Sequence, residues 1–258
     1  MAVRSLTCLL QREWTETRAT AMETVAETRP YLWRNYRDAV EQGYLEIGTS
    51  SAIGFPTGAG KSTTAQLKIH ATLLSGRKAV FLAPTHALVD QTTRDLRVAF
   101  PRATVRGERI DEFGFSSQRE DLPDLMVMTP EACLLSSHIE PERFDDVGLL
   151  IFDECHLMHD NTDGDRRAID AMLCILGFTR VAPDADIVLL SAMLRFTDEL
   201  SGWLEELTGR KSLPLENAWK PTRQLRGYVV YDAKRHAKLE KLLRAERVKK
   251  PREAFQSL

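Results

Sequence analysis

The sequence lacks several patterns that mark specialised classes of protein. No stretch of the 258 residues approaches about 18 uninterrupted apolar residues, which argues against a membrane span. Residues 1–30 contain no long apolar core followed by small residues, so a secretory signal is not expected. There is no internal repeat and no low-complexity tract. These absences predict a globular, cytoplasmic protein with no membrane association.

The sequence also lacks a large excess of either charge, and its cysteines are not paired in the sequence. The formal net charge is only −2, so no global positive field draws the chain onto nucleic acid, and any such contact must be local. The cysteines show no CxxC spacing and lie far apart in the chain, at Cys8, Cys133, Cys155 and Cys174. We therefore expect isolated thiols in a reducing compartment.

Short apolar runs alternate with longer amphipathic segments from about residue 52 onward. Each run is too short for a helix and has no polar alternation, which is typical of strands buried on both faces. Strands that alternate with helices predict an α/β fold with a central parallel sheet and helices on both faces. The expected strands are 52–54, 79–83, 125–128, 149–152 and 187–190, and the expected helices are 63–74, 87–100, 131–136, 166–176 and 197–207.

A glycine-rich loop between a predicted strand and a predicted helix is the strongest signal. Residues 55–63 read Phe-Pro-Thr-Gly-Ala-Gly-Lys-Ser-Thr. Gly58 and Gly60 allow left-handed turns that bring backbone amides close to a phosphate, and the helix N-terminus adds partial positive charge. Lys61 supplies a cation for the β and γ phosphates, and the Ser62 hydroxyl can bind Mg²⁺. The alternative, an ordinary turn before a lysine, is disfavoured by the strand–loop–helix context. The predicted nucleoside-triphosphate site consists of Thr57, Gly58, Ala59, Gly60, Lys61, Ser62 and Thr63.

Two adjacent acids, Asp153 and Glu154, end the apolar run 149–152. Adjacent carboxylates at the end of a buried strand are costly unless a cation compensates them, and Mg²⁺ bound to a nucleotide is the natural compensation. Asp153 would hold the metal through water, together with Ser62, while Glu154 would position and deprotonate the attacking water. With Lys61 they form the predicted catalytic group. A solvated strand end is the alternative for the acid pair alone.

With these two motifs, the chain resembles the DExH-type helicases of superfamily 2. Residues 219–227 are also similar to the end of the first motor domain in the repair- and RNA-exosome-associated helicases. Residues 56–62 are similar to their motif I, and further motifs follow in the family's order. These are Ala-Pro-Thr-His from residue 83, Val-Arg-Gly-Glu from 105, Val-Met-Thr-Pro-Glu from 127 and Ser-Ala-Met from 191. The resemblance covers roughly residues 30–231. It implies a RecA-like P-loop NTPase fold that uses ATP and Mg²⁺.

The resemblance also implies roles for residues outside the phosphate loop. A track for the phosphates of one nucleic-acid strand would be lined by Pro84, Thr85, Gly107 and Thr129. Hydroxyls, loop amides and helix N-termini bind phosphate without reading sequence, which makes such a track reasonable. Thr129 is also expected to cap a helix, and a simple helix start is its alternative.

Coupling between ATP and movement is implied for His156, Ser191 and Ala192. A metal site made by Cys155, His156 and His159 is the alternative for His156. It is disfavoured because no second ligand pair follows at a spacing typical of zinc sites.

The chain departs from the family at three positions. Phe55 replaces a small residue, and we expect it to pack under the loop. No glutamine lies at residues 34–38 to read adenine; Tyr36 or Trp33 would stack on the base or simply pack the helix. Met193 stands where the family has threonine, which removes a hydroxyl.

The predicted domains are a helical segment at 1–45, a RecA-like ATP-binding helicase domain 1 at 46–231, and a basic helix or linker at 232–258. A strand is expected at 227–231 and the basic helix from about 233 to 247. Only 65 residues follow Met193, whereas a second motor domain needs roughly 100 or more. We expect a second RecA-like domain to be supplied in cis or in trans. Alone, the chain should bind ATP, hydrolyse it slowly and leave duplexes intact.

Three functions remain open from sequence. The first is the ATPase half of a DNA or RNA helicase, including motors of repair or phage defence. The second is a module that binds nucleic acid or protein and uses ATP only as a conformational ligand. The third is another P-loop enzyme such as a kinase, which the motifs around Thr85 and Thr129 disfavour.

Overall fold

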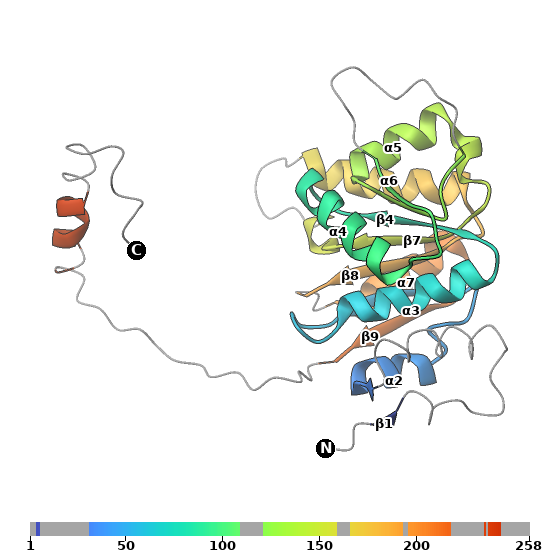
Figure 1. Cartoon of the computed structure of the whole chain (residues 1–258), viewed down its shortest axis with the longest axis horizontal. Helices are drawn as coiled ribbons and strands as arrows, with labels where there is room; N and C mark the ends of the chain where they lie inside the picture. The colour runs from blue at the N-terminus through green and yellow to red at the C-terminus, as the bar shows by residue number, and fades with distance from the viewer. Residues whose placement is uncertain are drawn as a thin grey trace. The chain divides into compact units, whose positions relative to one another are not determined.

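A parallel sheet forms the centre of the protein in the computed structural model, which describes residues 4–5, 31–108, 121–158, 166–192, 196–217, 235 and 237–243. Within these residues seven parallel strands pair in the order β5-β6-β4-β7-β8-β3-β9 (Figure 1). Their bounds are β3 (Ser50–Gly54), β4 (Lys78–Leu82), β5 (Val105–Gly107), β6 (Leu125–Met128), β7 (Val147–Asp153), β8 (Asp186–Ser191) and β9 (Ser212–Glu216).

The five strands expected between residues 52 and 190 are confirmed, and β5 and β9 are strands that sequence reasoning missed. Residues 105–108 match a short glycine-containing loop of the helicase family, so no strand was expected there. Residue Pro214 lies inside β9 and lacks a backbone donor, which argues against a strand. β9 nevertheless forms because it is an edge strand that pairs only with β3, and proline is tolerated at sheet edges.

Helices cover both faces of the sheet, as predicted. Side chains alternate along β7, so that Leu149 and Ile151 join one apolar cluster while Leu150 and Phe152 join the other. Helices α3 and α4 pack on the first cluster, and α5, α6 and α7 pack on the second. The bounds are α2 (Arg34–Glu41), α3 (Lys61–Leu74), α4 (His86–Ala99), α5 (Pro130–Ile139), α6 (Arg166–Val181) and α7 (Thr197–Thr208), with short 3-10 turns η2 (Pro141–Phe144) and η3 (Cys155–Met158).

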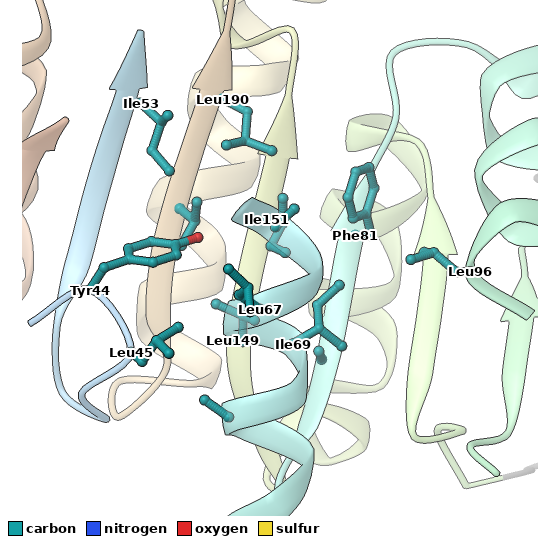
Figure 2. Close-up of a cluster of buried hydrophobic side chains, with 14 of the residues drawn as sticks. Tyr44, Leu45, Ile53, Leu67, Ile69, Phe81, Leu96, Leu149, Ile151 and Leu190 are labelled. Carbon is teal, nitrogen blue, oxygen red and sulfur yellow. The ribbon is translucent and has the colours of Figure 1, made fainter. Parts of the chain in front are cut away.

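The first cluster fixes the helix that carries the phosphate loop. Figure 2 shows Leu67 and Ile69 of α3 lying over Leu149 and Ile151 of β7. All four side chains are at most 1% exposed, so their burial contributes roughly 1.5–3 kcal/mol each. Among the described residues, no helix is long and apolar enough to cross a bilayer.

The ends of the chain differ in part from the expected helices. Arg4–Ser5 (β1) and Tyr31–Leu32 (β2) pair as short antiparallel strands, so these residues are extended rather than helical. The chain divides into two units, Met1–Pro221 and Thr222–Leu258. Residues 237–243 are helical, as expected for the basic tail. The strand expected at 227–231 and the domain boundary expected after residue 231 lie outside the described residues.

A buried ionic cluster anchors α3 to the start of β8. The side chains of Lys68 and Asp186 are both fully buried, and Lys68 Nζ lies 2.8 Å from Asp186 Oδ2. Lys68 also donates to the carbonyl oxygens of Glu46 at 2.7 Å and Thr49 at 3.0 Å, which uses all three N–H bonds of the ammonium group. Arg210 pairs with the other carboxylate oxygen of Asp186. The buried charges are therefore both paired and hydrogen-bonded.

Replacement of Lys68 should destabilise the fold strongly. Lys68→Met leaves Asp186 and two carbonyl oxygens without their ammonium partner in a site closed to water, so we expect about 3–5 kcal/mol less stability in urea unfolding. Lys78→Met is the matched control, because Lys78 pairs at 3.4 Å with Asp146, whose side chain is 74% exposed. That control should cost less than about 1 kcal/mol. Equal midpoints for Lys68→Met and wild type would contradict the structural role of the cluster.

Gly107 at the end of β5 allows α4 to lie close to the sheet. A Cβ added to Gly107 would lie 2.7 Å from Thr93 Oγ1 and 3.3 Å from Val89 Cγ1. Arg97 of the same helix donates its Nε to the carbonyl oxygen of Val105 at 3.1 Å, which ties α4 to β5. Gly107 therefore has a packing reason to be glycine, whatever its role toward a ligand.

Substitution at Gly107 should depend on Thr93. Gly107→Ala is expected to cost about 1–3 kcal/mol in urea unfolding, because the buried Thr93 must shift. In a background with Thr93→Ala the clash disappears, so the double variant should be less destabilised than the sum of the single variants. Gly202→Ala is the control: a Cβ there meets nothing within 4 Å, and alanine should stabilise α7 by about 1 kcal/mol. Strict additivity of the two changes would show that the contact does not matter.

Candidate functional site

The phosphate loop joins β3 to α3 and has the backbone that its glycines predict. Gly58 and Gly60 adopt left-handed conformations, with φ of 78° and 95°. The Ala59 N–H donates to the carbonyl oxygen of Pro56 at 2.9 Å, which closes the turn. A Cβ on Gly58 would meet nothing within 4 Å, whereas one on Gly60 would overlap the Tyr36 hydroxyl. The loop is therefore packed against α2 on one side and open on the other.

The side chains of the loop divide into supporting and exposed groups. Phe55 is 2% exposed and belongs to the core, which confirms that it packs under the loop. Thr63 is buried as well, while Thr57 and Ser62 are exposed at the surface of the loop. Gly60 is the N-cap of α3, so Lys61 and Ser62 begin the helix and lie at its positive end. The Ser62 hydroxyl is thus placed where a cation bound to phosphates can reach it.

Lys61 and Glu154 meet at this edge although they are 93 residues apart in sequence. Lys61 Nζ lies 3.3 Å from Glu154 Oε1, and the two side chains are only 15% and 33% exposed. Asp153 is the last residue of β7, and its Oδ1 accepts a hydrogen bond from the Glu154 N–H at 2.9 Å. The structure therefore brings the three predicted catalytic residues together.

The carboxylates occupy an environment that disfavours two negative charges. Burial, together with the neighbouring Glu154 carboxylate, raises the pKa of Asp153. Glu154 has a φ of 54°, the single left-handed residue other than glycine in the described part of the chain. Such a conformation costs on the order of 1–3 kcal/mol and persists where surrounding contacts hold it. A cation bound beside Asp153 would relieve the repulsion between the two acids.

The oxygens at this edge fit Mg²⁺ that is held jointly with a nucleotide. Mg²⁺ prefers oxygen ligands and is usually bound through one or two carboxylates plus substrate phosphates and water. The Asp153 carboxylate and the Ser62 hydroxyl supply this chemistry. In the part of the chain that the structure describes, no group of three or more His, Cys, Asp or Glu side chains could hold a metal by itself. The protein side chains therefore fit a metal whose remaining ligands come from phosphate and water.

His156 connects the acid pair with the end of β8. Its Nδ1 lies 3.2 Å from Glu154 Oε2 and 3.1 Å from Ser191 Oγ. Ser191 is the last residue of β8, the neighbour of β7, and Ala192 follows it half-buried. Cys155 is 2% exposed, and burial raises the pKa of its thiol to about 12. The buried neutral thiol does not favour the alternative metal site, whose third member, His159, lies outside the described residues, as does Met193.

The residues expected to contact nucleic acid follow neighbouring strands at the same edge. Strands β5, β6 and β4 are adjacent, and the N–H groups of Glu108 and Ala83 donate to carbonyl oxygens of β6 at 2.8 and 2.9 Å. Gly107 and Thr85 are exposed and Pro84 is half-buried. These residues therefore lie side by side, next to the strands that carry the nucleotide site.

Thr129 is placed differently from the expected track residue. It is 4% exposed, and its hydroxyl accepts a hydrogen bond from the Ala132 N–H at 3.3 Å, which confirms the expected cap of α5. Thr85 caps α4 in the same way, through the Leu88 N–H at 3.3 Å. Thr129 would thus act mainly by positioning the N-terminus of α5, since its side chain is buried and its oxygen already accepts a hydrogen bond. The nucleic-acid roles of these residues remain predictions.

Sequence reasoning missed the part that α2 plays behind the loop. Asn35 donates its Nδ2 to the carbonyl oxygen of Ala59 at 3.1 Å, and Tyr36 is 5% exposed against Gly60. Trp33 stacks on Tyr36 with ring centroids 5.8 Å apart. Tyr36 therefore packs the helix, one of the two options open from sequence. No spacing pattern pointed to Asn35, because the contact depends on how α2 folds back on the loop.

Comparisons with known proteins agree with this geometry. The sequence model of the DEAD/DEAH box helicase family matches residues 35–200. The ATP-dependent DNA helicase Hel308 of Thermoplasma acidophilum is 27% identical over 174 residues, which cover 67% of this chain and 25% of that protein. Hel308 of Methanocaldococcus jannaschii is 27% identical over 188 residues, covering 70% of this chain and 15% of that protein. The probable helicase HelY of Mycobacterium tuberculosis is 25% identical over 169 residues, covering 64% and 17%.

A solved structure supports the fold independently. The DUF1998 helicase MrfA bound to DNA superposes with a TM-score of 0.59 at 17% identity, covering 82% of this chain and 30% of that one. The chain spans a quarter or less of the length of the curated relatives named above. The family match, the ordered motifs and the parallel sheet lead to one conclusion: the chain belongs to the DEAD/DEAH box helicase family and has the architecture of the N-terminal motor domain of a superfamily 2 helicase.

Proposed function

We propose that this domain binds ATP with Mg²⁺ and, together with a second RecA-like domain in cis or in trans, couples ATP hydrolysis to movement on DNA or RNA. The contact between Lys61 Nζ and Glu154 Oε1 at 3.3 Å carries the proposal. It joins the first residue of α3 to the acid that follows β7. The ammonium group that would bind phosphate and the carboxylate that would act as base therefore lie at one edge of the sheet. The names of the relatives as helicases support the motor function.

Each group has a role that follows from its placement. The amides at the start of α3 and the Lys61 ammonium group would bind the phosphates of ATP. Ser62 and Asp153 would hold Mg²⁺, which when bound neutralises charge on the phosphates. Glu154 would orient a water molecule towards the γ-phosphorus and accept its proton, while the bond to the bridging oxygen of ADP breaks. Lys61 must leave Glu154 to reach the phosphates, which frees one carboxylate oxygen for that water.

The nucleic-acid strand would lie along the other half of the same edge. Thr85 and Gly107 are exposed there. Helix α4 begins shortly after β4, and helix α5 begins shortly after β6. Loop amides and helix N-termini bind phosphates without sequence preference, which suits a chain with a net charge of −2 and no global positive field. His156 and Ser191 would take part in coupling ATP hydrolysis to movement, because they join the acid pair after β7 to the end of β8, the strand between β7 and the strand that leads into the phosphate loop.

A second RecA-like domain is the partner that this site calls for. The segment that matches this chain makes up 25% or less of each relative named above, so those relatives are at least about four times as long as the segment. An arginine contributed from another domain raises phosphoryl-transfer rates by about 10³–10⁵. We therefore expect the 258-residue chain alone to bind MgATP, to hydrolyse it slowly and to leave duplexes intact. Efficient unwinding by the chain alone would contradict the need for this partner.

The Glu154→Gln variant tests the motor proposal against the binding-module alternative. We expect single-stranded DNA or RNA to stimulate phosphate release by the wild-type domain paired with a second motor domain. Glu154→Gln should lower the stimulated rate by about 10²–10⁴ while MgATP still binds, because the amide cannot accept the proton. Glu41→Gln, an amide substitution at the exposed end of α2, is the control and should leave the rate unchanged. Tight binding with no turnover in the wild-type protein would favour the binding module.

A further inference from the structure

Helix α2 supports the phosphate loop from the side opposite its open face. Asn35 is 1% exposed and donates its Nδ2 to the carbonyl oxygen of Ala59 at 3.1 Å. The next residue, Tyr36, is 5% exposed, and its hydroxyl fills the space where a Cβ on Gly60 would lie. Two consecutive residues of α2 thus contact two consecutive residues of the loop. These contacts involve no residue of the catalytic group.

The Asn35 hydrogen bond determines which way one loop peptide faces. In a planar trans peptide the C=O and the following N–H point in opposite directions. The Ala59 carbonyl points towards Asn35, so the Gly60 N–H points away from α2 and towards the open side of the loop. Gly60 is also the N-cap of α3, where backbone amides bind anions. A single side-chain amide therefore orients an N–H at the place where phosphates would bind.

The segment that carries Asn35 is itself held firmly. Ala39 and Val40 on α2 are each 1% exposed and belong to the same apolar cluster as Ala59. Beyond the helix, the Tyr44 hydroxyl donates to the carbonyl oxygen of Thr64 at 3.2 Å. Burial, and secondarily the charge of Asp186, raise the pKa of Tyr44 well above its ordinary value, so this hydroxyl keeps its proton.

Thr64 closes the arrangement at the start of α3. Its N–H and its Oγ1 both donate to the carbonyl oxygen of Gly60, at 3.1 and 3.2 Å. The loop is therefore held at Ala59 by Asn35, at Gly60 by Tyr36 and Thr64, and at Thr64 by Tyr44. A donor fixed in this way is preorganised, so the loop need not be reordered when an anion binds.

We propose that α2 belongs to the nucleotide-binding machinery and that Asn35 is a positioning residue, which orients the Ala59–Gly60 peptide so that the Gly60 N–H faces the nucleotide phosphates. The inference rests on the proposed function, because it requires ATP to occupy the loop. It assigns a role at the phosphate loop to Asn35, which sequence reasoning did not single out. The match to the family model begins at residue 35, so it includes α2 from Asn35 onward.

Asn35→Asp tests the proposal with the smallest change of shape. It replaces an amide donor by a carboxylate that repels the Ala59 carbonyl, so the peptide is free to rotate. We expect the Kd for MgATP, measured by calorimetry, to rise at least about tenfold. The rate of nucleic-acid-stimulated hydrolysis at saturating MgATP should stay within about threefold of wild type, because Glu154 and Asp153 are untouched.

Gln42→Glu is the matched control for this change. It makes the same amide-to-acid substitution just beyond the end of the same helix, where the exposed Gln42 donates to the carbonyl oxygen of Asp38 at 3.1 Å instead of to the loop. The MgATP affinity of this variant should remain within about twofold of wild type, since surface charges contribute little. Asn35→Ala provides a second variant that removes the donor without burying a charge, and it replaces Asn35→Asp if the latter does not fold.

The outcomes separate the inference from the function on which it rests. If wild type binds MgATP and Lys61→Ala does not, but the Asn35 variant binds like wild type, the positioning role is overturned and the proposed function stands. Parallel losses in affinity, in saturated rate and in melting temperature without nucleotide would also overturn it, because they would show a structural role only. If wild type itself fails to bind MgATP, the proposed function fails first.

Discussion

Parallel pairing of the strands is the constraint on which the whole site depends. When neighbouring strands run the same way, their carboxyl ends meet at one edge and the connecting segments cross the faces of the sheet. Gly54, Asp153 and Ser191 end β3, β7 and β8, which are neighbours in the order β7-β8-β3. The phosphate loop and the acid pair therefore meet because of the strand order, although the chain between them contains β4, β5 and β6.

The two ends of the sheet use buried charge in different ways. At the amino ends of the strands, Lys68 has an acceptor for every N–H, and Asp186 is paired with two cations. Such a saturated cluster holds α3 in place. At the carboxyl ends, Asp153 has a raised pKa and Glu154 has a left-handed backbone. Strain and unfavourable charge are concentrated where a ligand would relieve them, which is typical of functional sites.

Much of the fold was predictable, because the signals that specify it are local. The apolar runs of β4, β6, β7 and β8 show buried strands, and the glycines of the loop predict the left-handed turns that Gly58 and Gly60 adopt. β9 was not predictable, since Pro214 is acceptable only at a sheet edge, and a sequence does not show which strand lies at the edge. Asn35 could not be found for a similar reason: its partner is a backbone carbonyl 24 residues away.

The candidate site was predictable only as far as its motifs extend. The carboxylates and Lys61 were identified by residue type and spacing, but Thr129 shows the limit of that method. A hydroxyl that precedes a helix can face a ligand or cap the helix, and the sequence is the same in both cases. The structure uses the Thr129 hydroxyl as a cap and buries it. Exposure, which decides what a residue can contact, depends on the tertiary structure.

Glu154 links the phosphate loop to the end of β8 through its own contacts. Its carboxylate is held on one side by Lys61 and on the other by His156, whose Nδ1 also lies 3.1 Å from Ser191 Oγ. Phosphates that attract Lys61 would remove one of these contacts, and the strained backbone of Glu154 would then depend more on His156 and on Ser191. A change at the loop would in this way alter the hydrogen bonds at the end of β8. The same few contacts that hold the base in place would thus transmit the presence of the nucleotide from the phosphate loop to the end of β8.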